Sequence, residues 1–173
     1  MRNNLVLAGF MGCGKSTVGR LLAEKLGYTF CDSDCVIEQR EGAAISQIFA
    51  DNGEDYFRKL EKTVIKELSS KDGLVIATGG GAVLNPENAE NLRKTGVVFF
   101  LEITPETVLK RLENDISRPL LMRNDKAKAI TTLMSERKPL YTAVAHFVVN
   151  AENTPENVAE QIIELYIKNR SKP

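Results

Sequence analysis

Residues 9–16, GFMGCGKS, constrain the fold of this chain more than any other stretch. They fit the pattern GxxxxGK[ST], which forms a phosphate-binding loop where it joins a strand to a helix. Residues 5–8 before it are an apolar run typical of a buried strand. Apolar residues then recur at helical spacing from Val18 to Leu26, with Gly27 as the expected end of the helix. A plain glycine-rich turn is the alternative, but such a turn would not require a buried strand before it and a helix after it. The stretch therefore predicts a strand–loop–helix unit.

The residue types of this loop suit a bound triphosphate. Glycines let several backbone N–H groups point at one phosphate, and the helix that follows adds the positive end of its dipole. In loops of this kind the lysine, here Lys15, reaches the β- and γ-phosphates, and the hydroxyl of Ser16 ligates Mg²⁺. We therefore predict that the chain binds a nucleoside triphosphate together with Mg²⁺.

Length and charge narrow the class of protein. The 173 residues suit one domain of ordinary size, here residues 1–173. Lysine plus arginine equals aspartate plus glutamate at 23 each, so no overall field attracts nucleic acid or an anionic membrane. No apolar run approaches the roughly 20 residues of a membrane span, and residues 1–4 lead into the first strand without a visible signal peptide. We expect neither a membrane nor a nucleic-acid partner.

The cysteines favour a reducing compartment. Cys13, Cys31 and Cys35 are odd in number, and one lies inside the glycine-rich loop. This suits a cytoplasmic protein better than a disulfide framework. Cys31 and Cys35 could form half of a metal site, but no partner cluster accompanies them, and His146 lies far along the chain. Small buried cysteines are the preferred interpretation.

Strand and helix patterns alternate along the chain. Apolar runs predict strands at 5–8, 29–31, 74–77, 97–101 and 147–149. Helical periodicity follows at about 36–42 and 45–68, the latter interrupted at 52–53, and Asn-Pro-Glu or Thr-Pro-Glu marks helix starts near 85, 104 and 154. Periodicity is lost at about 114–125, and a further helix follows. The alternation predicts a single α/β domain with parallel strands between layers of helices.

The loop alone does not choose between GTPase, motor ATPase and kinase. A GTPase would carry an [NT]KxD segment, which this sequence lacks. A motor or transport ATPase would carry an apolar strand that ends in Asp-Glu. The nearest match is Glu102, which we interpret instead as an acidic residue just before a helix start. The polar residues elsewhere in the chain favour a kinase.

Polar residues follow two of the predicted strands, where open α/β sheets bind ligands. Asp32 and Asp34 follow the second strand, and Thr78 with the glycines 79–81 follows the third. Asp34 could simply cap the helix expected at Cys35, and Asp32 could be a solvated turn residue. Three successive glycines after a buried strand destabilise the chain unless the backbone must approach a ligand closely.

Two arginines and one aperiodic loop complete the candidate site. Arg58 shares a helix face with Glu61, either as a surface pair or as an arginine oriented towards an anion. Arg137 lies on the apolar stripe of its helix, where an unpaired charge is costly. It could hold an anionic ligand, extend to solvent, or mark a bend before Pro139. Arg118 lies in the aperiodic stretch, which could be an ordinary loop or a lid that closes over a nucleotide.

Taken together, these residues make the chain similar to the shikimate kinase family, within the nucleoside-monophosphate-kinase-like P-loop group. The resemblance covers essentially the whole chain. Its specific part is the triple glycine at 79–81 combined with the two arginine motifs at 118–121 and 137–141. The segments that carry it are residues 9–16, 32–34, Phe57-Arg58 with Glu61, 78–81, 118–121 and 137–141.

The resemblance implies a three-layer fold with strand order 2-3-1-4-5 and transfer of the γ-phosphoryl of ATP to the 3-hydroxyl of shikimate, in aromatic amino-acid synthesis through chorismate. Residues of about 33–61 would bind the substrate, and about 112–125 would form a lid. Catalysis would rest on Lys15, Asp34 and Arg118, and Mg²⁺ on Ser16 with Asp32, the latter through water. ATP would contact Gly12, Cys13, Gly14, Lys15, Ser16, Thr17, Arg111, Arg118 and Pro155. Shikimate would contact Asp34, Arg58, Gly79, Gly80, Gly81 and Arg137, with Glu61 behind Arg58.

Two other functions stay open from sequence alone. A sibling kinase, for gluconate or a nucleoside monophosphate, would share the fold, although a nucleotide acceptor needs a longer segment than this chain provides. A regulator that has lost transfer would not be expected to keep Lys15, Asp34, Arg58, Arg118 and Arg137 together. The chain lacks a long apolar surface helix, which favours a monomer.

Overall fold

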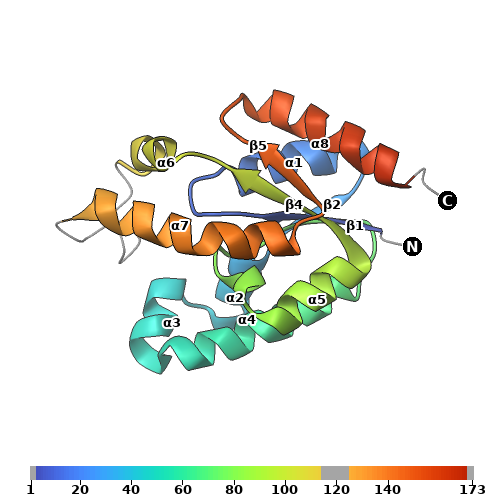
Figure 1. Cartoon of the computed structure of the whole chain (residues 1–173). Coiled ribbons are helices and arrows are strands. Elements are labelled where there is room, and N and C mark those ends of the chain that lie inside the picture. Colours follow the sequence, from blue (N-terminus) through green and yellow to red (C-terminus); the bar gives the residue numbers. More distant parts are fainter. Residues whose placement is uncertain (1–2, 114–124, 171–173) are drawn as a thin grey trace.

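A computed structural model describes residues 3–113 and 125–170, and within them five parallel strands form one sheet (Figure 1). The spatial order is β2-β3-β1-β4-β5, which confirms the order expected from the family resemblance. The central strand β1 pairs with β3 on one side and β4 on the other. The strands are β1 (Asn4–Ala8), β2 (Thr29–Asp32), β3 (Leu74–Ala77), β4 (Gly96–Glu102) and β5 (Phe147–Asn150).

Helices cover both faces of this sheet, so its central strands are apolar on both sides (Figure 1). In β1, Leu5 and Leu7 pack into the core under α1 and α8, whereas Val6 and Ala8 pack into the core under α4 and α5. This is why residues 5–8 form a continuous apolar run rather than an alternating one. The helices of the two faces are α1 (Lys15–Leu26) and α8 (Pro155–Arg170) on one side, and α4 (Glu54–Ser69) and α5 (Pro86–Thr95) on the other.

The remaining elements lie around the carboxyl ends of the strands. In α7, Ile130 packs into the core under α1 and α8, and Tyr141 packs into the core under α4 and α5, so α7 contributes to both cores. These elements are α2 (Ser33–Glu41), α3 (Ile45–Asn52), α6 (Pro105–Arg111), α7 (Lys126–Val144) and the short 3-10 helix η1 (Ala82–Leu84).

Helix boundaries follow the local signals in the sequence. α5, α6 and α8 each begin at a proline, and the Asn85 side chain accepts hydrogen bonds from two backbone N–H groups at the start of α5. Gly27 ends α1 in the left-handed conformation, with φ of 66°. Gly53, with φ of 81°, separates α3 from α4, as the predicted interruption at 52–53 requires.

Two sequence alternatives are wrong. The helix after β2 begins at Ser33, and its N-cap is Asp32 rather than Asp34, because the Asp32 side chain accepts hydrogen bonds from the N–H groups of Asp34 and Cys35. Asp32 is therefore not an ordinary solvated turn residue. α7 continues past Pro139 to Val144.

Within residues 3–113 and 125–170, no helix combines the length and apolar character needed to span a bilayer.

Candidate active site

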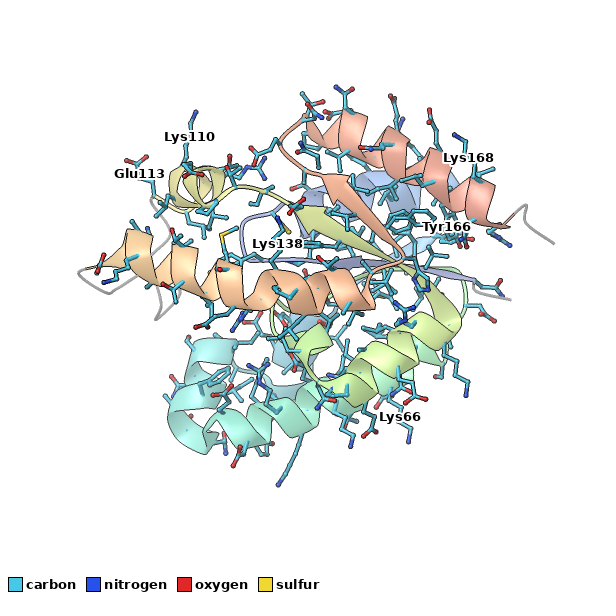
Figure 2. All side chains as sticks on the ribbon, in the orientation of Figure 1. Lys66, Lys110, Glu113, Lys138, Tyr166 and Lys168 are labelled. Atoms are coloured by element: carbon cyan, nitrogen blue, oxygen red, sulfur yellow. The ribbon has the colours of Figure 1, made fainter. Side chains whose placement is uncertain are left out.

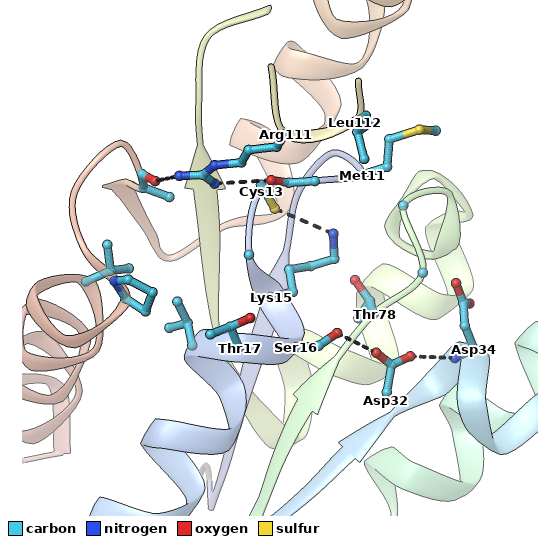
Figure 3. Close-up of a pocket in the computed structure, with 18 of the residues that line it drawn as sticks. Met11, Cys13, Lys15, Ser16, Thr17, Asp32, Asp34, Thr78, Arg111 and Leu112 are labelled. Carbon is cyan, nitrogen blue, oxygen red and sulfur yellow. Dashed lines mark hydrogen bonds between the residues drawn. The ribbon is translucent and has the colours of Figure 1, made fainter. Parts of the chain in front are cut away.

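A cavity of about 510 Å³ opens at the carboxyl ends of β1, β2 and β3 (Figure 3). Loops placed there by the parallel sheet come from distant parts of the sequence. Its lining includes most of the predicted site: Gly12, Cys13, Gly14, Lys15, Ser16, Thr17, Asp32, Asp34, Thr78, Gly79, Gly80, Arg111 and Pro155. The structure thus brings the predicted nucleotide residues other than Arg118, which lies outside the described residues, and part of the predicted acceptor site to one cavity.

The phosphate-binding loop depends on backbone conformations that favour glycine. Gly12 and Gly14 have φ of 75° and 93°, in the left-handed region. Gly14 is the N-cap of α1 and supplies no side-chain cap, so the N-terminal amides of the helix are left for an anion. Cys13 between these glycines is buried, as the sequence predicts. Cys31 is half-buried and Cys35 exposed, so the expectation of buried cysteines holds for Cys13 alone.

Lys15 folds back over the loop it belongs to. Its ammonium donates to the carbonyl oxygens of Gly9 and Phe10, both at 2.9 Å, and lies 3.5 Å from Cys13 Sγ. These contacts hold the Lys15 ammonium against the phosphate-binding loop (Figure 3). An ammonium held this way can exchange carbonyl oxygens for phosphate oxygens without moving far, because both are acceptors of the same donor.

Ser16 and Asp32 meet at the floor of the cavity. Ser16 Oγ donates to Asp32 Oδ2 at 2.8 Å, while Asp32 Oδ1 accepts from the N–H groups of Asp34 at 3.0 Å and Cys35 at 3.4 Å (Figure 3). Asp32 thus anchors the start of α2 and also lies beside the loop hydroxyl. A hydroxyl and a carboxylate are the hard oxygen ligands that Mg²⁺ prefers, and this ion usually keeps several waters. The residues present fit such an ion.

The glycine loop, defined here as Gly79–Gly81, lies close to two charged side chains. A Cβ atom added to Gly79 would lie 2.4 Å from Asp34 Oδ1, and one added to Gly81 would lie 2.7 Å from an Arg58 guanidinium nitrogen. Any larger residue would therefore push the carboxylate or the guanidinium away. The sequence predicted that a ligand needs these glycines. The structure adds a second reason, since Asp34 and Arg58 themselves occupy the space.

Arg58 is held by two carboxylates. Its Nη1 donates to both oxygens of Glu61 at 3.2 and 3.0 Å, and its Nε and Nη2 donate to Glu54 Oε1 at 3.2 and 2.9 Å. The Glu61 side chain is only 1% exposed, whereas that of Glu54 is 64% exposed. The pair with Glu61 is therefore not a surface pair, and it aims the guanidinium at Gly81. The contact with Glu54 was not predicted from the sequence, although its position four residues before Arg58 in a helix indicates such a pair.

Burial of Glu61 should make stability depend on pH. Burial raises the pKa of its carboxyl above the usual 4.5, against the opposing effect of Arg58. Between pH 4.5 and the raised pKa, the native state keeps a proton that the unfolded chain has lost. The free energy of unfolding therefore falls as the pH rises through that window. In Glu61→Gln this contribution is absent, so we expect the stability difference to move in favour of the variant as the pH rises.

Urea unfolding of both proteins at several pH values measures this difference. Glu54→Gln is a matched control, because it removes an exposed carboxylate from the same arginine. A wild-type-minus-Glu61→Gln difference that does not vary with pH would contradict the role given to burial.

Arg137 lies on the inner side of α7. Its guanidinium carbon is 6.0 Å from the centroid of the Phe10 ring, and one helical turn later Tyr141 donates to the carbonyl oxygen of Gly80 at 2.5 Å. Arg137 thus contacts the phosphate-binding loop rather than extending freely into solvent. Its helix also contacts the glycine loop. Tyr141 belongs to segment 137–141, which carries the family resemblance, but the sequence assigned it no role in the site.

Arg111 joins the two sides of the predicted nucleotide site. Its Nη1 donates to Gly12 O and its Nη2 to Ala151 O, both at 3.1 Å (Figure 3). Pro155 lines the same cavity, beside the segment that follows β5. Glu152 in that segment accepts from the Thr104 N–H at 2.6 Å and the Thr107 hydroxyl at 2.5 Å, which ties the segment to α6. Glu152 was not predicted, and nothing local in the sequence indicates it.

The predicted lid falls largely outside the described residues. Of the range 112–125, only Leu112, Glu113 and Asp125 are described. Arg118, and with it the segment 118–121 and Arg123, lie outside.

Comparison with known proteins places these features in a family. The family model described as shikimate kinase matches residues 11–166. The shikimate kinase of Caldicellulosiruptor saccharolyticus is 47% identical over 170 residues, which cover 98% of each chain. That of Caldanaerobacter subterraneus subsp. tengcongensis is 44% identical over 165 residues, covering 95% of this chain and 96% of the relative.

Solved structures agree with this result. The shikimate kinase from Acinetobacter baumannii, solved in complex with shikimate, superposes with a TM-score of 0.93 at 42% identity, covering 98% of this chain and 96% of that one. A gluconokinase from Sinorhizobium meliloti, at 16% identity and a TM-score of 0.58, shares the fold alone. The family model spans residues 11–166 and the relatives align over nearly the whole chain, so this chain belongs to the shikimate kinase family.

Proposed function

We propose that the chain transfers the γ-phosphoryl group of ATP to the 3-hydroxyl group of shikimate, giving shikimate 3-phosphate and ADP on the route to chorismate. One observation carries the proposal. A single cavity is lined by Lys15 and Ser16, which suit a triphosphate, and by Asp34 with Gly79 and Gly80 of the glycine loop, which suit a polyhydroxylated acceptor. Both substrates therefore meet at one place, which phosphoryl transfer requires.

On the nucleotide side, the chain's contribution is binding and charge neutralisation. The amides of residues 12–17 and the N-terminus of α1 hold the phosphates. The Lys15 ammonium moves from the carbonyls of Gly9 and Phe10 onto phosphate oxygens. Arg111 and Pro155 flank the base. Arg118, from the segment outside the described residues, adds positive charge at the transferring phosphoryl.

Mg²⁺ belongs to this side of the proposal. Ser16 Oγ and, through water, Asp32 would hold it. The ion would neutralise charge on the β- and γ-phosphates when bound. Among the described residues, no group of three or more His, Cys, Asp or Glu side chains is placed to bind a metal. The ligands would therefore be completed by water and triphosphate, as is usual for Mg²⁺.

On the acceptor side, positively charged side chains bind the carboxylate of shikimate and a negatively charged side chain binds the reacting hydroxyl. Arg58 and Arg137 hold the shikimate carboxylate, and the backbone of Gly79, Gly80 and Gly81 holds ring hydroxyls. The Asp34 carboxylate accepts a hydrogen bond from the 3-hydroxyl group of shikimate and so directs the hydroxyl oxygen at the γ-phosphorus. Glu61 keeps Arg58 in place from behind. Positioning supplies most of the rate in a reaction of this kind.

Arg58→Ala is expected to raise KM for shikimate by about ten- to a hundredfold, because a charge-assisted contact to a carboxylate is worth about 1.5–3 kcal/mol. KM for ATP should change less than about threefold, since Arg58 lies at the glycine loop and not at the phosphate-binding loop. Steady-state kinetics with each substrate varied in turn measure both constants. Arg40→Ala, which removes an exposed arginine paired with Glu67, is a matched control. An effect confined to ATP would contradict the assignment.

A coupled assay of ADP release tests the function itself. We would supply ATP and Mg²⁺ without acceptor, and then with shikimate, gluconate or nucleoside monophosphates. The proposal requires release that depends on both shikimate and Mg²⁺. Release with another acceptor would place the chain's activity elsewhere among P-loop kinases. ATP binding without acceptor-dependent release would instead favour a regulator.

We also propose that the chain is a single domain that acts as a monomer in the cytoplasm, without a nucleic-acid or membrane partner. Large exposed apolar side chains of the described residues are scattered over different elements, as Tyr56, Leu140, Val148 and Ile167. Scattered apolar residues do not form the continuous patch of a stable interface. Light scattering that returned twice the mass of one chain would refute the monomer.

A further inference from the structure

The two-residue segment Gly79-Gly80 of the glycine loop is held by a side-chain hydroxyl at each end. The Gly79 N–H donates to Ser33 Oγ at 2.9 Å, and the Gly80 carbonyl oxygen accepts from the Tyr141 hydroxyl at 2.5 Å. Both side chains are buried, Ser33 fully and Tyr141 to 2% exposure. We propose that Ser33 and Tyr141 are positioning residues that hold the Gly79-Gly80 segment between Asp34 and Arg137 and thereby set the affinity for the acceptor, an inference that rests on the proposed function.

The Ser33 contact joins the glycine loop to the start of α2. Ser33 lies between Asp32, which caps the helix, and Asp34, whose carboxylate lies against Gly79. Because Ser33 Oγ accepts the Gly79 N–H, the first turn of α2 and the glycine loop are held in one relative position. Loss of this bond would let the loop move relative to the Asp34 carboxylate.

The Tyr141 contact joins the other end of the Gly79-Gly80 segment to α7. Tyr141 follows Arg137 by one helical turn, so the two side chains lie on the same side of the helix. Its ring stacks on Phe100 with centroids 5.1 Å apart, which directs the hydroxyl to Gly80. A Cβ added to Gly80 would lie 3.9 Å from Gly9 O, from Met11 N and from the Tyr141 hydroxyl. Gly80 is therefore the point where α7, the glycine loop and the phosphate-binding loop meet.

Tyr141 is suited to positioning rather than to proton transfer. Burial raises the pKa of its phenol to about 12, against the lowering effect of Arg137. The hydroxyl therefore stays protonated at neutral pH and remains a donor to Gly80. Replacing tyrosine by phenylalanine keeps the ring against Phe100 and removes the donor alone, which leaves the Gly80 carbonyl without this bond.

Two variants and two matched controls test the inference. The variants are Tyr141→Phe and Ser33→Ala. Tyr166→Phe also removes a buried hydroxyl, from a tyrosine 1% exposed in the core on the other face of the sheet, where it lies 3.2 Å from the Tyr28 hydroxyl (Figure 2). Ser69→Ala removes a buried hydroxyl at the end of α4 that has no hydrogen-bond partner among the described residues. The controls report the effect of losing such a hydroxyl away from the site.

Each variant is expected to raise KM for shikimate about five- to tenfold, the factor that one lost hydrogen bond supplies, with KM for ATP within about twofold of wild type. The controls should leave both constants unchanged. The melting temperature should fall by similar amounts in the two variants and in Tyr166→Phe, which each lose a hydrogen bond, and least in Ser69→Ala, which loses none. Equal increases in both KM values, or unchanged KM for shikimate, would overturn the inference.

Two further readouts separate positioning from other roles. In the double variant, KM for shikimate should rise by less than the product of the two single increases, because both hydrogen bonds hold the same two-residue segment, Gly79-Gly80. Fully multiplicative losses would show that the hydroxyls act independently and would contradict the shared role. The pH profile of kcat should keep its shape in Tyr141→Phe, and a missing alkaline limb would make Tyr141 an acid or base instead.

The outcome for the proposed function is read separately. Wild-type turnover with shikimate decides that function. If another acceptor is the substrate, the same variants measured with that acceptor still test whether Ser33 and Tyr141 set its KM. Failure of one proposal is therefore distinguishable from failure of the other.

Discussion

Asp34→Asn is expected to lower kcat by about two to four orders of magnitude, the range that a positioned acid or base contributes. Asparagine keeps the shape of the side chain against Gly79 but removes the charge that accepts the 3-hydroxyl proton. The dissociation constant for ATP should stay within about twofold of wild type, because Asp34 does not belong to the phosphate-binding loop. Steady-state kinetics and calorimetric titration with ATP measure the two quantities.

The control for this substitution is Asp72→Asn. Asp72 is exposed in the turn before β3, at the end of the strand opposite the cavity, so its loss should leave kcat unchanged. If Asp34→Asn turns over at the wild-type rate, the carboxylate only belongs to the first turn of α2 and the acceptor lies elsewhere.

Lys15→Ala is expected to lower kcat/KM for ATP by about two to three orders of magnitude, as the loss of one preorganised donor to a developing charge does. The ammonium stabilises the transferring phosphoryl more than the ground state, so most of the loss should fall on kcat. Lys15 also bonds the carbonyls of Gly9 and Phe10, and some loss of loop order accompanies the substitution.

Lys25→Ala separates these effects. Lys25 lies in the last turn of α1, where it is exposed and pairs with Glu160 at 3.7 Å. It reports the cost of removing a lysine from the same helix away from the cavity. Shikimate binding by Lys15→Ala, followed by calorimetry without nucleotide, should match wild type. Wild-type kcat/KM for ATP in this variant would exclude the nucleotide site described above.

The elements of the fold could be predicted because their signals are local. Apolar runs located all five strands, and Asn85, Thr104 and Thr154 with the prolines after them located three helix starts. The phosphate-binding loop is a contiguous stretch, so its pattern is complete in the sequence. The Arg58–Glu61 pair follows from a spacing of three residues in a helix. The strand order had a different source, the family resemblance, since periodicity does not identify a strand's neighbours.

The amino-acid sequence by itself therefore determined which elements form and which residues on them are candidates to bind phosphate, hydroxyl and carboxylate groups. Only the tertiary structure decided which of them touch. It assigned the N-cap of α2 to Asp32, set Gly79 against Asp34, and joined Tyr141 to Gly80, which lies 61 residues away in sequence. The physical reason is that a parallel sheet brings the carboxyl ends of distant strands to one edge. The partner of a side chain at that edge depends on strand order and helix packing, and no spacing within its own element specifies either.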